Sequence, residues 1–143
     1  TEIRCTSPSQ AHGLYAVEIV SNDQDFTADG VTFEYFKAYA IAGAQPQSGA
    51  VLGGTLVTVS GSGFVRGSGL ACRFGSNVPV AATWLSSEKL ACSSRPSARP
   101  GNVSIEVSMN NQDFSSSGVL FEYVGPPSVR SLRPSQGPIG GGV

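Results

Sequence analysis

The sequence has few of the residue types on which catalysis and metal binding usually depend. Its 143 residues include one histidine, three cysteines and one tryptophan, and only 13% of them are charged. The single histidine, His12, lies in a turn-like stretch, and no second imidazole is present to act as a general base. The sequence contains no CxxC pair, and one histidine does not complete a zinc site. We therefore expect no enzymatic activity, no metal and no cofactor.

Charge and hydropathy argue against two further classes of partner. Nine Lys and Arg residues against ten Asp and Glu residues give a formal net charge of -1. The basic residues gather only as Arg95 with Arg99 and as Arg130 with Arg133, which offers no electrostatic footprint for nucleic acid. No apolar run approaches the roughly 18 residues needed to cross a bilayer. We expect neither a nucleic-acid partner nor a membrane span in this segment.

The most informative feature present is an internal repeat. The stretch VEIVSNDQDFTADGVTFEYF begins at Val17 and returns as IEVSMNNQDFSSSGVLFEYV from Ile105, a step of 88 because 105 minus 17 is 88. A second echo has the same step, since QPQSGAVLGG from Gln45 returns as RPSQGPIGGG from Arg133. The matched pairs of the first echo include Asp25 with Asp113, Phe26 with Phe114, Gly30 with Gly118, Phe33 with Phe121 and Tyr35 with Tyr123.

This period predicts one whole unit flanked by two fragments. We expect residues 40–124 to form a complete domain, residues 1–36 to be the C-terminal half of a preceding unit, and residues 125–143 to begin a following one. Both ends would then fall inside domains, where severed strands expose unpaired backbone. The sequence is therefore expected to be a segment of a longer polypeptide. The alternative is that its terminal pieces pair with neighbouring molecules.

The odd number of cysteines is explained by the same repeat. Cys5 matches Cys92, one residue out of step, and the counterpart of Cys72 would precede the sequence given. We predict a disulfide between Cys72 and Cys92, closing a loop of about 20 residues and adding on the order of 3 kcal/mol. Cys5 is expected to have its partner outside this segment. Two buried free thiols are the alternative to the disulfide, which would imply an oxidising compartment.

Apolar residues within the unit recur with a period of two, which predicts half-buried strands. Residues 102–109 and 119–124 alternate in this way, and the turn-forming stretch NNQDFSSSG between them predicts a hairpin. No segment sustains a period of 3.6, and Gly or Pro interrupts the chain about every ten residues. We predict an all-β antiparallel sandwich. The residues expected to face its core include Val57, Val59, Leu70, Cys72, Phe74, Cys92, Val103, Ile105, Val107, Met109, Val119, Phe121 and Tyr123.

Several ordered motifs carry a family resemblance. GGTLVTVSGSGF from Gly53, CRFG from Cys72, LACSS from Leu90, the strand VSIEVSMNNQDFS and the triplet FEY together resemble the immunoglobulin-like IPT/TIG domain. The resemblance covers the central unit and extends into both fragments, so the repeats of about 88 residues are expected to be tandem domains of this type. The family occurs in extracellular receptors of the plexin type and in some transcription factors. The cysteine pair resembles the extracellular branch, so we expect an extracellular or cell-surface location.

Asn102 is the candidate modification site. Asn102-Val103-Ser104 is the only N-x-Ser/Thr sequon in the chain, and the strand alternation places Asn102 on the solvent face, so we predict N-glycosylation there. The stretch around Asp25 and the matching one around Asp113 could supply calcium ligands, but each has only two or three suitable side chains, and Asx-turns are the simpler interpretation. The single tryptophan, Trp84, is expected to pack against a sheet edge, with carbohydrate stacking as the alternative.

Short linkers that contain proline predict a restricted angle between successive units. We therefore expect a non-catalytic, extracellular structural repeat protein that forms a stiff rod or fibre and carries glycans. Its partners would be glycans and neighbouring copies of the same repeat, arranged end to end as a homopolymeric filament. The alternative is a segment of a receptor or adhesion ectodomain that binds a protein or carbohydrate ligand.

Overall fold

The computed structural model describes residues 2–142, and every regular element in that range is a β-strand. The chain divides into two units between Tyr39 and Ala40. The first unit contains β1 (Gly13–Ala16) and β2 (Thr32–Tyr35). The second contains β3 (Ala40–Gln45), β4 (Ser48–Ala50), β5 (Leu56–Ser62), β6 (Ala71–Phe74), β7 (Val80–Ala81), β8 (Thr83–Ser86), β9 (Lys89–Ser93), β10 (Gly101–Ser108) and β11 (Leu120–Val124). The predicted all-β class is confirmed.

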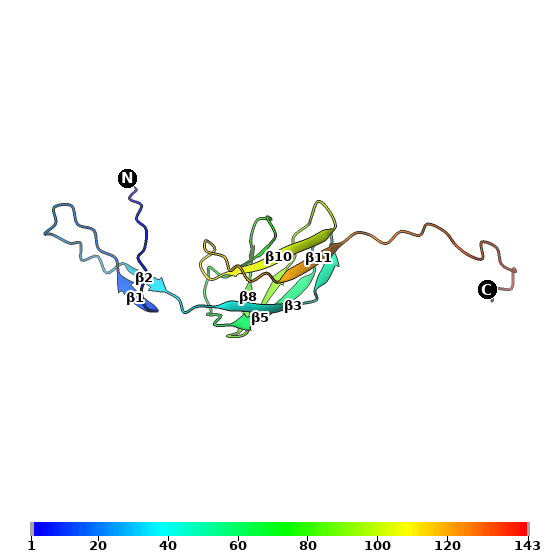
Figure 1. Ribbon diagram of the computed structural model, residues 1–143, viewed down its shortest axis with the longest axis horizontal. Coiled ribbons are helices and arrows are strands. Elements are labelled where there is room, and N and C mark those ends of the chain that lie inside the picture. Colours follow the sequence, from blue (N-terminus) through cyan, green and yellow to red (C-terminus); the bar gives the residue numbers. More distant parts are fainter. Residues whose placement is uncertain (1, 143) are drawn as a thin grey trace. The chain divides into compact units, whose positions relative to one another are not determined.

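The second unit is a sandwich of two sheets. One sheet has the strand order β4-β11-β10-β6-β7 and the other has the order β3-β5-β9-β8. Figure 1 shows β10 and β11 on one side of the sandwich, with β3, β5 and β8 on the other. Two sheets that each present one apolar face must cover those faces against each other, which is why the two-residue period leads to this architecture.

The core lies between these two sheets and consists of the residues on their inward faces. Phe121 is in edge-to-face contact with Phe74 and with Tyr123, at ring-centroid distances of 5.3 and 5.1 Å, a favourable geometry for aromatic rings. The alternation predicted for residues 119–124 is confirmed, and the predicted inward positions Ile105, Val107 and Met109 are buried. The prediction is wrong at Ser108, which was expected on the solvent face but is fully buried, with its hydroxyl donating to Oδ1 of Asn110 in the following loop. Fully buried side chains in this core include Val57, Val59, Cys72, Phe74, Leu90, Cys92, Ile105, Val107, Phe121 and Tyr123.

One strand pair departs from the predicted antiparallel arrangement. β3 pairs antiparallel with β5, whereas β4 pairs parallel with β11, with Gly49 opposite Tyr123. The prediction of a wholly antiparallel sandwich is therefore wrong at this pair. The chain passes from one sheet to the other through Pro46 and Gln47, and a proline cannot donate a ladder hydrogen bond. The first strand of the unit therefore ends at Gln45, and the chain continues along the edge of the opposite sheet.

The first unit contains a hairpin that matches β10 and β11 pair by pair. Gly13 lies opposite Tyr35 in the first hairpin, and Gly101 lies opposite Tyr123 in the second. The next three pairs keep the same step of 88, because 101 minus 13 and 123 minus 35 are both 88. The isolated bridges beyond the strands, Val20 with Phe26 and Ser108 with Phe114, differ by the same step. Repeated sequence has therefore produced repeated backbone pairing.

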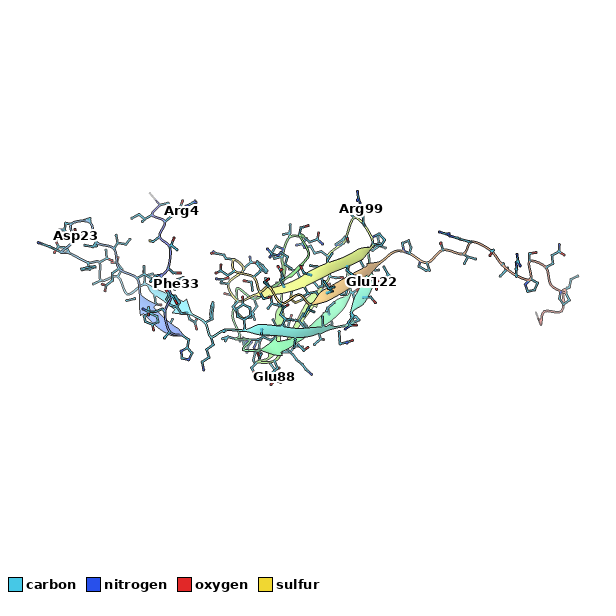
Figure 2. The ribbon with its side chains drawn as sticks, in the orientation of Figure 1. Arg4, Asp23, Phe33, Glu88, Arg99 and Glu122 are labelled. Carbon is cyan, nitrogen blue, oxygen red and sulfur yellow. A yellow bond between two sulfur atoms is a disulfide. The ribbon has the colours of Figure 1, made fainter. Side chains whose placement is uncertain are left out.

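Burial is what distinguishes the two hairpins. Phe121 is fully buried, while 44% of Phe33, its counterpart, is exposed to solvent. Ile105 is fully buried, whereas 43% of Val17 is exposed. Figure 2 shows Phe33 on β2, a strand that pairs only with β1 among the described residues. Within the described part of the first unit, residues 2–39, no second sheet is present to cover the apolar face of this hairpin.

Residues 125–142 form no strand but do contain a defined turn (Figure 1). The Gly141 N–H donates to the carbonyl of Pro138 at 3.0 Å, and the Gly53 N–H donates in the same way to Ala50 at 2.9 Å. Gly141 has a φ of 76° and Gly53 a φ of 78°, a left-handed conformation that glycine adopts without steric cost. The turn that follows β4 is therefore reproduced one period later.

Candidate functional site

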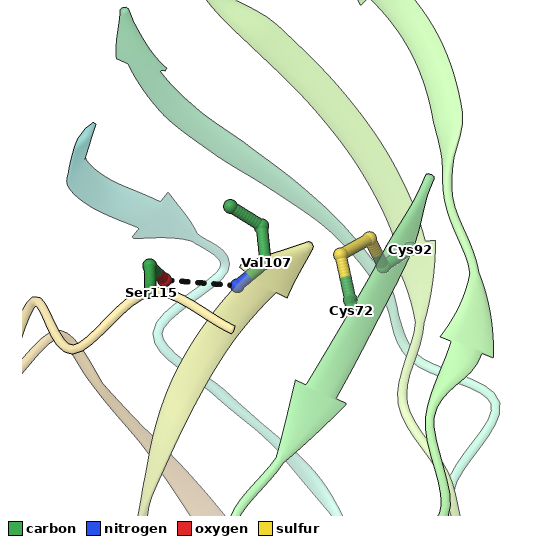
Figure 3. The surroundings of a disulfide bond; sticks show 4 residues. All are labelled: Cys72, Cys92, Val107 and Ser115. Atoms are coloured by element: carbon green, nitrogen blue, oxygen red, sulfur yellow. Dashed lines mark hydrogen bonds between the residues drawn. A yellow bond between two sulfur atoms is a disulfide. The ribbon is translucent and has the colours of Figure 1, made fainter. Parts of the chain in front are cut away.

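Cys72 and Cys92 form a disulfide that links the two sheets of the sandwich (Figure 3). Cys72 lies on β6 of the five-stranded sheet and Cys92 on β9 of the four-stranded sheet, with their Cα atoms 6.2 Å apart. Both cysteines are buried. Cys5 is an exposed free thiol in the described part of the chain. The crosslink thus joins the two layers that enclose the core.

Asn102 lies on the solvent-facing side of β10, and its side chain is exposed. It is opposite Glu122 of β11, which Figure 2 labels on the same hairpin. The two residues line a shallow hollow of about 450 Å³ together with Gln47 and residues 42–44. The hollow is polar, and the sequon is therefore presented on an open sheet surface, the kind of location that a glycosyltransferase can reach.

The two loops that contain candidate calcium ligands, around Asp25 and Asp113, form Asx-turns. Asn110 accepts hydrogen bonds from the backbone N–H groups of Gln112 and Asp113 at 3.0 and 2.9 Å, and its Nδ2 donates to Asp113 at 2.8 Å. Asn22 makes the equivalent bonds 88 residues earlier. Figure 2 labels Asp23 in the first of these two loops. Within residues 2–142, no group of three or more His, Cys, Asp or Glu residues is placed to hold a metal ion.

Trp84 lies on β8, the edge strand of the four-stranded sheet, and is half-buried. Its indole N–H donates to the carbonyl of Phe64 at 3.2 Å. The prediction that Trp84 packs at a sheet edge is confirmed. A ring fixed in this way has its polar atom satisfied by the protein.

An ion pair on the outer face of the five-stranded sheet was not predicted from the sequence. Arg73 on β6 faces Glu106 on β10, and both Nε and Nη2 donate to the same carboxylate oxygen, Nε at 3.1 Å. The Arg73 guanidinium also lies 4.1 Å from the ring centroid of Phe114, a cation–π contact. The long loop between β10 and β11 is thereby fixed against the sheet. The register of β6 against β10 places Arg73 opposite Glu106, and no local sequence motif indicates this pairing.

Tyr123 is a second residue whose role the sequence did not indicate. Its hydroxyl donates to the carbonyl of Arg95 at 2.6 Å. Burial raises the pKa of Tyr123 above its ordinary value because the phenolate loses solvation, and hydrogen bonds from Asn77 and Ser94 offset part of that rise. The bond anchors the segment between β9 and β10 to the last strand of the unit.

The first unit has an open groove beside its hairpin. The groove has a volume of about 400 Å³, and its lining is mostly apolar. Tyr15, Phe33 and Tyr35 form one wall, and the segment 5–8 forms much of the other. Aromatic edge-to-face contacts at 5.4 and 5.0 Å hold Tyr15 and Phe33 against Tyr35. This concave apolar surface is a candidate binding site in the first unit.

The two packed sheets, their buried inter-sheet disulfide and the long β10–β11 hairpin define a disulfide-containing immunoglobulin-like module. The IPT/TIG domain family matches residues 40–123, which is more than half of the chain. The chain therefore belongs to the IPT/TIG family. Domains of this family are generally non-catalytic.

Curated relatives and solved structures agree with this assignment. The chain is 24% identical to fibrocystin-L of Mus musculus over 125 residues and 25% identical to Plexin-A4 of Mus musculus over 127 residues, 87% and 89% of this chain. Two structures of the Plexin A4 full extracellular region, with domains 1 to 8 and 1 to 10, match at 26% identity with TM-scores of 0.55 and 0.57. They cover 64% and 71% of this chain, which corresponds to 9% and 8% of theirs.

The chain spans only 3% of fibrocystin-L and 7% of Plexin-A4. What carries over from these relatives is the type of domain and its setting. Similarity to the extracellular region of Plexin A4, together with the disulfide between Cys72 and Cys92, indicates an extracellular domain. No helix in residues 2–142 is long and apolar enough to cross a membrane.

Proposed function

We propose that the chain is a stretch of an extracellular structural protein in which IPT/TIG domains repeat every 88 residues and form a stiff rod or fibre. Residues 1–36 would be the C-terminal half of one repeat, residues 40–124 a complete repeat, and residues 125–143 the start of the next. The observation that carries this proposal is the agreement of the two hairpins, pair by pair, at a step of 88. Independent hairpins have no reason to share register, loop bridges and Asx-turns at one fixed step.

The short linkers support stiffness of the proposed rod. Only residues 36–39 separate β2 from β3, and the connector after β11 contains Pro126 and Pro127. Proline fixes φ and limits the conformations of a linker. The longest strand, β10, has eight residues, and at roughly 3.3 Å per residue plus end loops a repeat would extend the rod by about 40 Å. The expected end-to-end partners are neighbouring copies of the same repeat.

Electron microscopy of native material at neutral pH tests the rod. We expect filaments whose axial period is about 40 Å or a small multiple of it, as the strand length implies. Treatment with a reducing agent under denaturing conditions serves as the control, because it should abolish the filaments if folded domains build them. Discrete monomeric particles in the untreated sample would contradict the structural role.

We also propose that Asn102 carries an N-linked glycan. The exposed position of Asn102 on β10 supports this proposal, since the sequon lies on an open sheet surface. Peptide mapping of native material after enzymatic deglycosylation should find Asn102 converted to Asp. In a secreted recombinant chain, Ser104→Ala should abolish the glycan while leaving Asn102 in place. An unmodified Asn102 peptide from native material would refute the proposal.

A segment of a receptor or adhesion ectodomain is the second candidate. It is favoured by the similarity of this chain to the extracellular region of Plexin A4. In that case one unit would bind a protein or carbohydrate ligand, and units along the array would differ at the binding surface. Near-identical units in the complete sequence would favour the rod, whereas one divergent unit with a large exposed apolar patch would favour the receptor.

A further inference from the structure

The groove of the first unit has a counterpart in the second unit that is filled by the chain itself. There, residues 48–55 run between β11 and the segment 94–97. On one side, the Glu122 N–H donates to the carbonyl of Gln47, the residue just before this segment, at 2.8 Å. The Val51 N–H donates to the carbonyl of Val124 at 3.0 Å. On the other side, the Gly54 N–H donates to Ser94 at 2.8 Å. Residues 48–55 therefore join the last strand to the segment before β10.

The same two walls are present in the first unit without that filling. Phe33 and Tyr35 of β2 match Phe121 and Tyr123 at the step of 88. Ser7 of the segment 5–8 matches Ser94 at a step of 87, the step that also relates Cys5 to Cys92. Between these walls lies the groove of about 400 Å³. The edge of β2 that corresponds to the β4-bound edge of β11 has no strand partner among the described residues. An unpaired edge next to an apolar groove is suited to accept an added strand.

Residues 136–142 are the segment of this chain that matches the filling. Gln136, Gly137 and Pro138 stand 88 positions after Ser48, Gly49 and Ala50. The turn that follows them already has the hydrogen bond and glycine conformation of the turn at residues 50–54. Ile139, which matches the half-buried Val51, is fully exposed to solvent. The turn of this segment therefore has the conformation of the matching turn in the second unit, and the segment exposes an apolar residue whose counterpart is half-buried.

We propose that residues 136–142 of one copy of the chain occupy the groove on the first unit of a second copy, pairing in parallel with β2, so that copies associate head to tail. This proposal rests on the repeat organisation proposed above and names the partner at that surface. The template register, Tyr123 opposite Gly49, places Tyr35 of one copy opposite Gly137 of the other. The contact joins different surfaces of the two copies, so each copy can bind one neighbour at each of these surfaces.

Gly137 provides a specific steric test. A Cβ atom at its counterpart, Gly49, would meet the Thr55 side chain and would lie 2.8 Å from Cζ of Phe121. In the docked arrangement Gly137 would face the Phe33 ring in the same way, so alanine there would clash. Gly140 is a matched control, since a Cβ at Gly140 meets no atom within 4 Å and its counterpart, Leu52, is 83% exposed.

Sedimentation velocity of the 143-residue chain over a range of concentrations is the experiment. We expect the mean mass to rise with concentration, Gly137→Ala to weaken association at least 10-fold, and Gly140→Ala to behave as the parent chain. Phe33→Ala should also weaken association, and adding Gly137→Ala to it should cause little further loss because both changes affect one contact.

A parent chain that stays monomeric to millimolar concentration would overturn the docking. Equal effects of Gly137→Ala and Gly140→Ala on association would also overturn it. So would a monomeric chain in which Gly137→Ala changes the NMR signals of the Phe33 ring, because the chain would then fill its own groove. None of these results contradicts the proposed rod, because in a continuous array each repeat would fill this groove with a segment of its own chain. The microscopy of native filaments therefore tests the rod separately. Native material without filaments, combined with head-to-tail association of this chain, would instead contradict the rod alone.

Discussion

Replacing Phe121 by alanine is expected to destabilise the second unit strongly, whereas replacing its counterpart, Phe33, should leave that unit unchanged. Phe121 is fully buried and contacts both Phe74 and Tyr123 edge to face. Phe33 lies in the first unit and is 44% exposed. The two residues share sequence context and strand register, so the comparison isolates the effect of the second sheet.

The expected magnitudes follow from this difference in burial. Truncating a buried phenylalanine costs about 3–5 kcal/mol. A domain with the size of residues 40–124 has a total stability of roughly 4–13 kcal/mol, so Phe121→Ala removes about a quarter of it or more. Phe33→Ala loses about 1–1.5 kcal/mol of transfer free energy, and this loss falls on the first unit. The free-energy changes of mutations at distant sites are independent of each other within about 0.5 kcal/mol. We therefore expect Phe33→Ala to change the unfolding free energy of the second unit by no more than this.

Urea denaturation followed by tryptophan fluorescence measures this difference. Trp84 is the only tryptophan and lies on β8, so its emission reports on the second unit alone. The samples are kept dilute so that no association buries Phe33. Phe121→Leu replaces Phe121→Ala if the alanine variant does not fold, and it should still lower the midpoint clearly. Equal shifts for the variants at positions 33 and 121 would refute the conclusion that only Phe121 belongs to a completed core.

Three further outcomes follow from the second unit. Replacing both Cys72 and Cys92 by alanine should lower the free energy of unfolding by about 3 kcal/mol through a loop of 20 residues, and urea midpoints that agree within error would contradict this. Because burial raises the pKa of Tyr123, the folded state retains the phenol proton more tightly, so stability should be fully present below about pH 10 and fall as pH rises through the folded pKa. Tyr123→Phe should flatten that fall, and an unchanged alkaline profile would be inconsistent with the buried phenol. Gly49→Ala should destabilise the unit because a Cβ there meets the Thr55 side chain and the Phe121 ring, and thermal unfolding at an unchanged midpoint would show that both side chains move aside freely.

The parts of the fold that could be predicted are those encoded by local sequence. The two-residue alternation along β10 gives Ile105 and Val107 inward positions, and both are fully buried. Turn-forming residues between β10 and β11 gave the hairpin, and the structure forms its Asx-turn at Asn110. These features depend on residues close together in the chain, so one sequence is sufficient to indicate them.

The features that were missed depend on pairing between distant segments. The parallel contact of β4 with β11 requires the first strand of the unit to change sheets, and a run of three strand residues has no signal that specifies the direction of its partner. The ion pair of Arg73 with Glu106 arises from the register of two strands 33 residues apart. The bond from Tyr123 to Arg95 joins residues separated by 28 positions. None of these has a motif within one segment.

The two hairpins separate what a local sequence determines from what a fold adds. Thr27 and Ser115 accept hydrogen bonds from Ile19 and Val107 at the same distance, 3.0 Å, so turn and loop geometry form alike in both copies. Their apolar faces nevertheless differ in exposure, because burial requires a second sheet. The second unit, residues 40–142, contains one, and the described part of the first unit does not. A lone two-stranded hairpin is marginally stable in water. The first hairpin therefore gains from any partner that covers Phe33 and extends β2, and residues 136–142 are the segment of this chain whose sequence and turn geometry match that need.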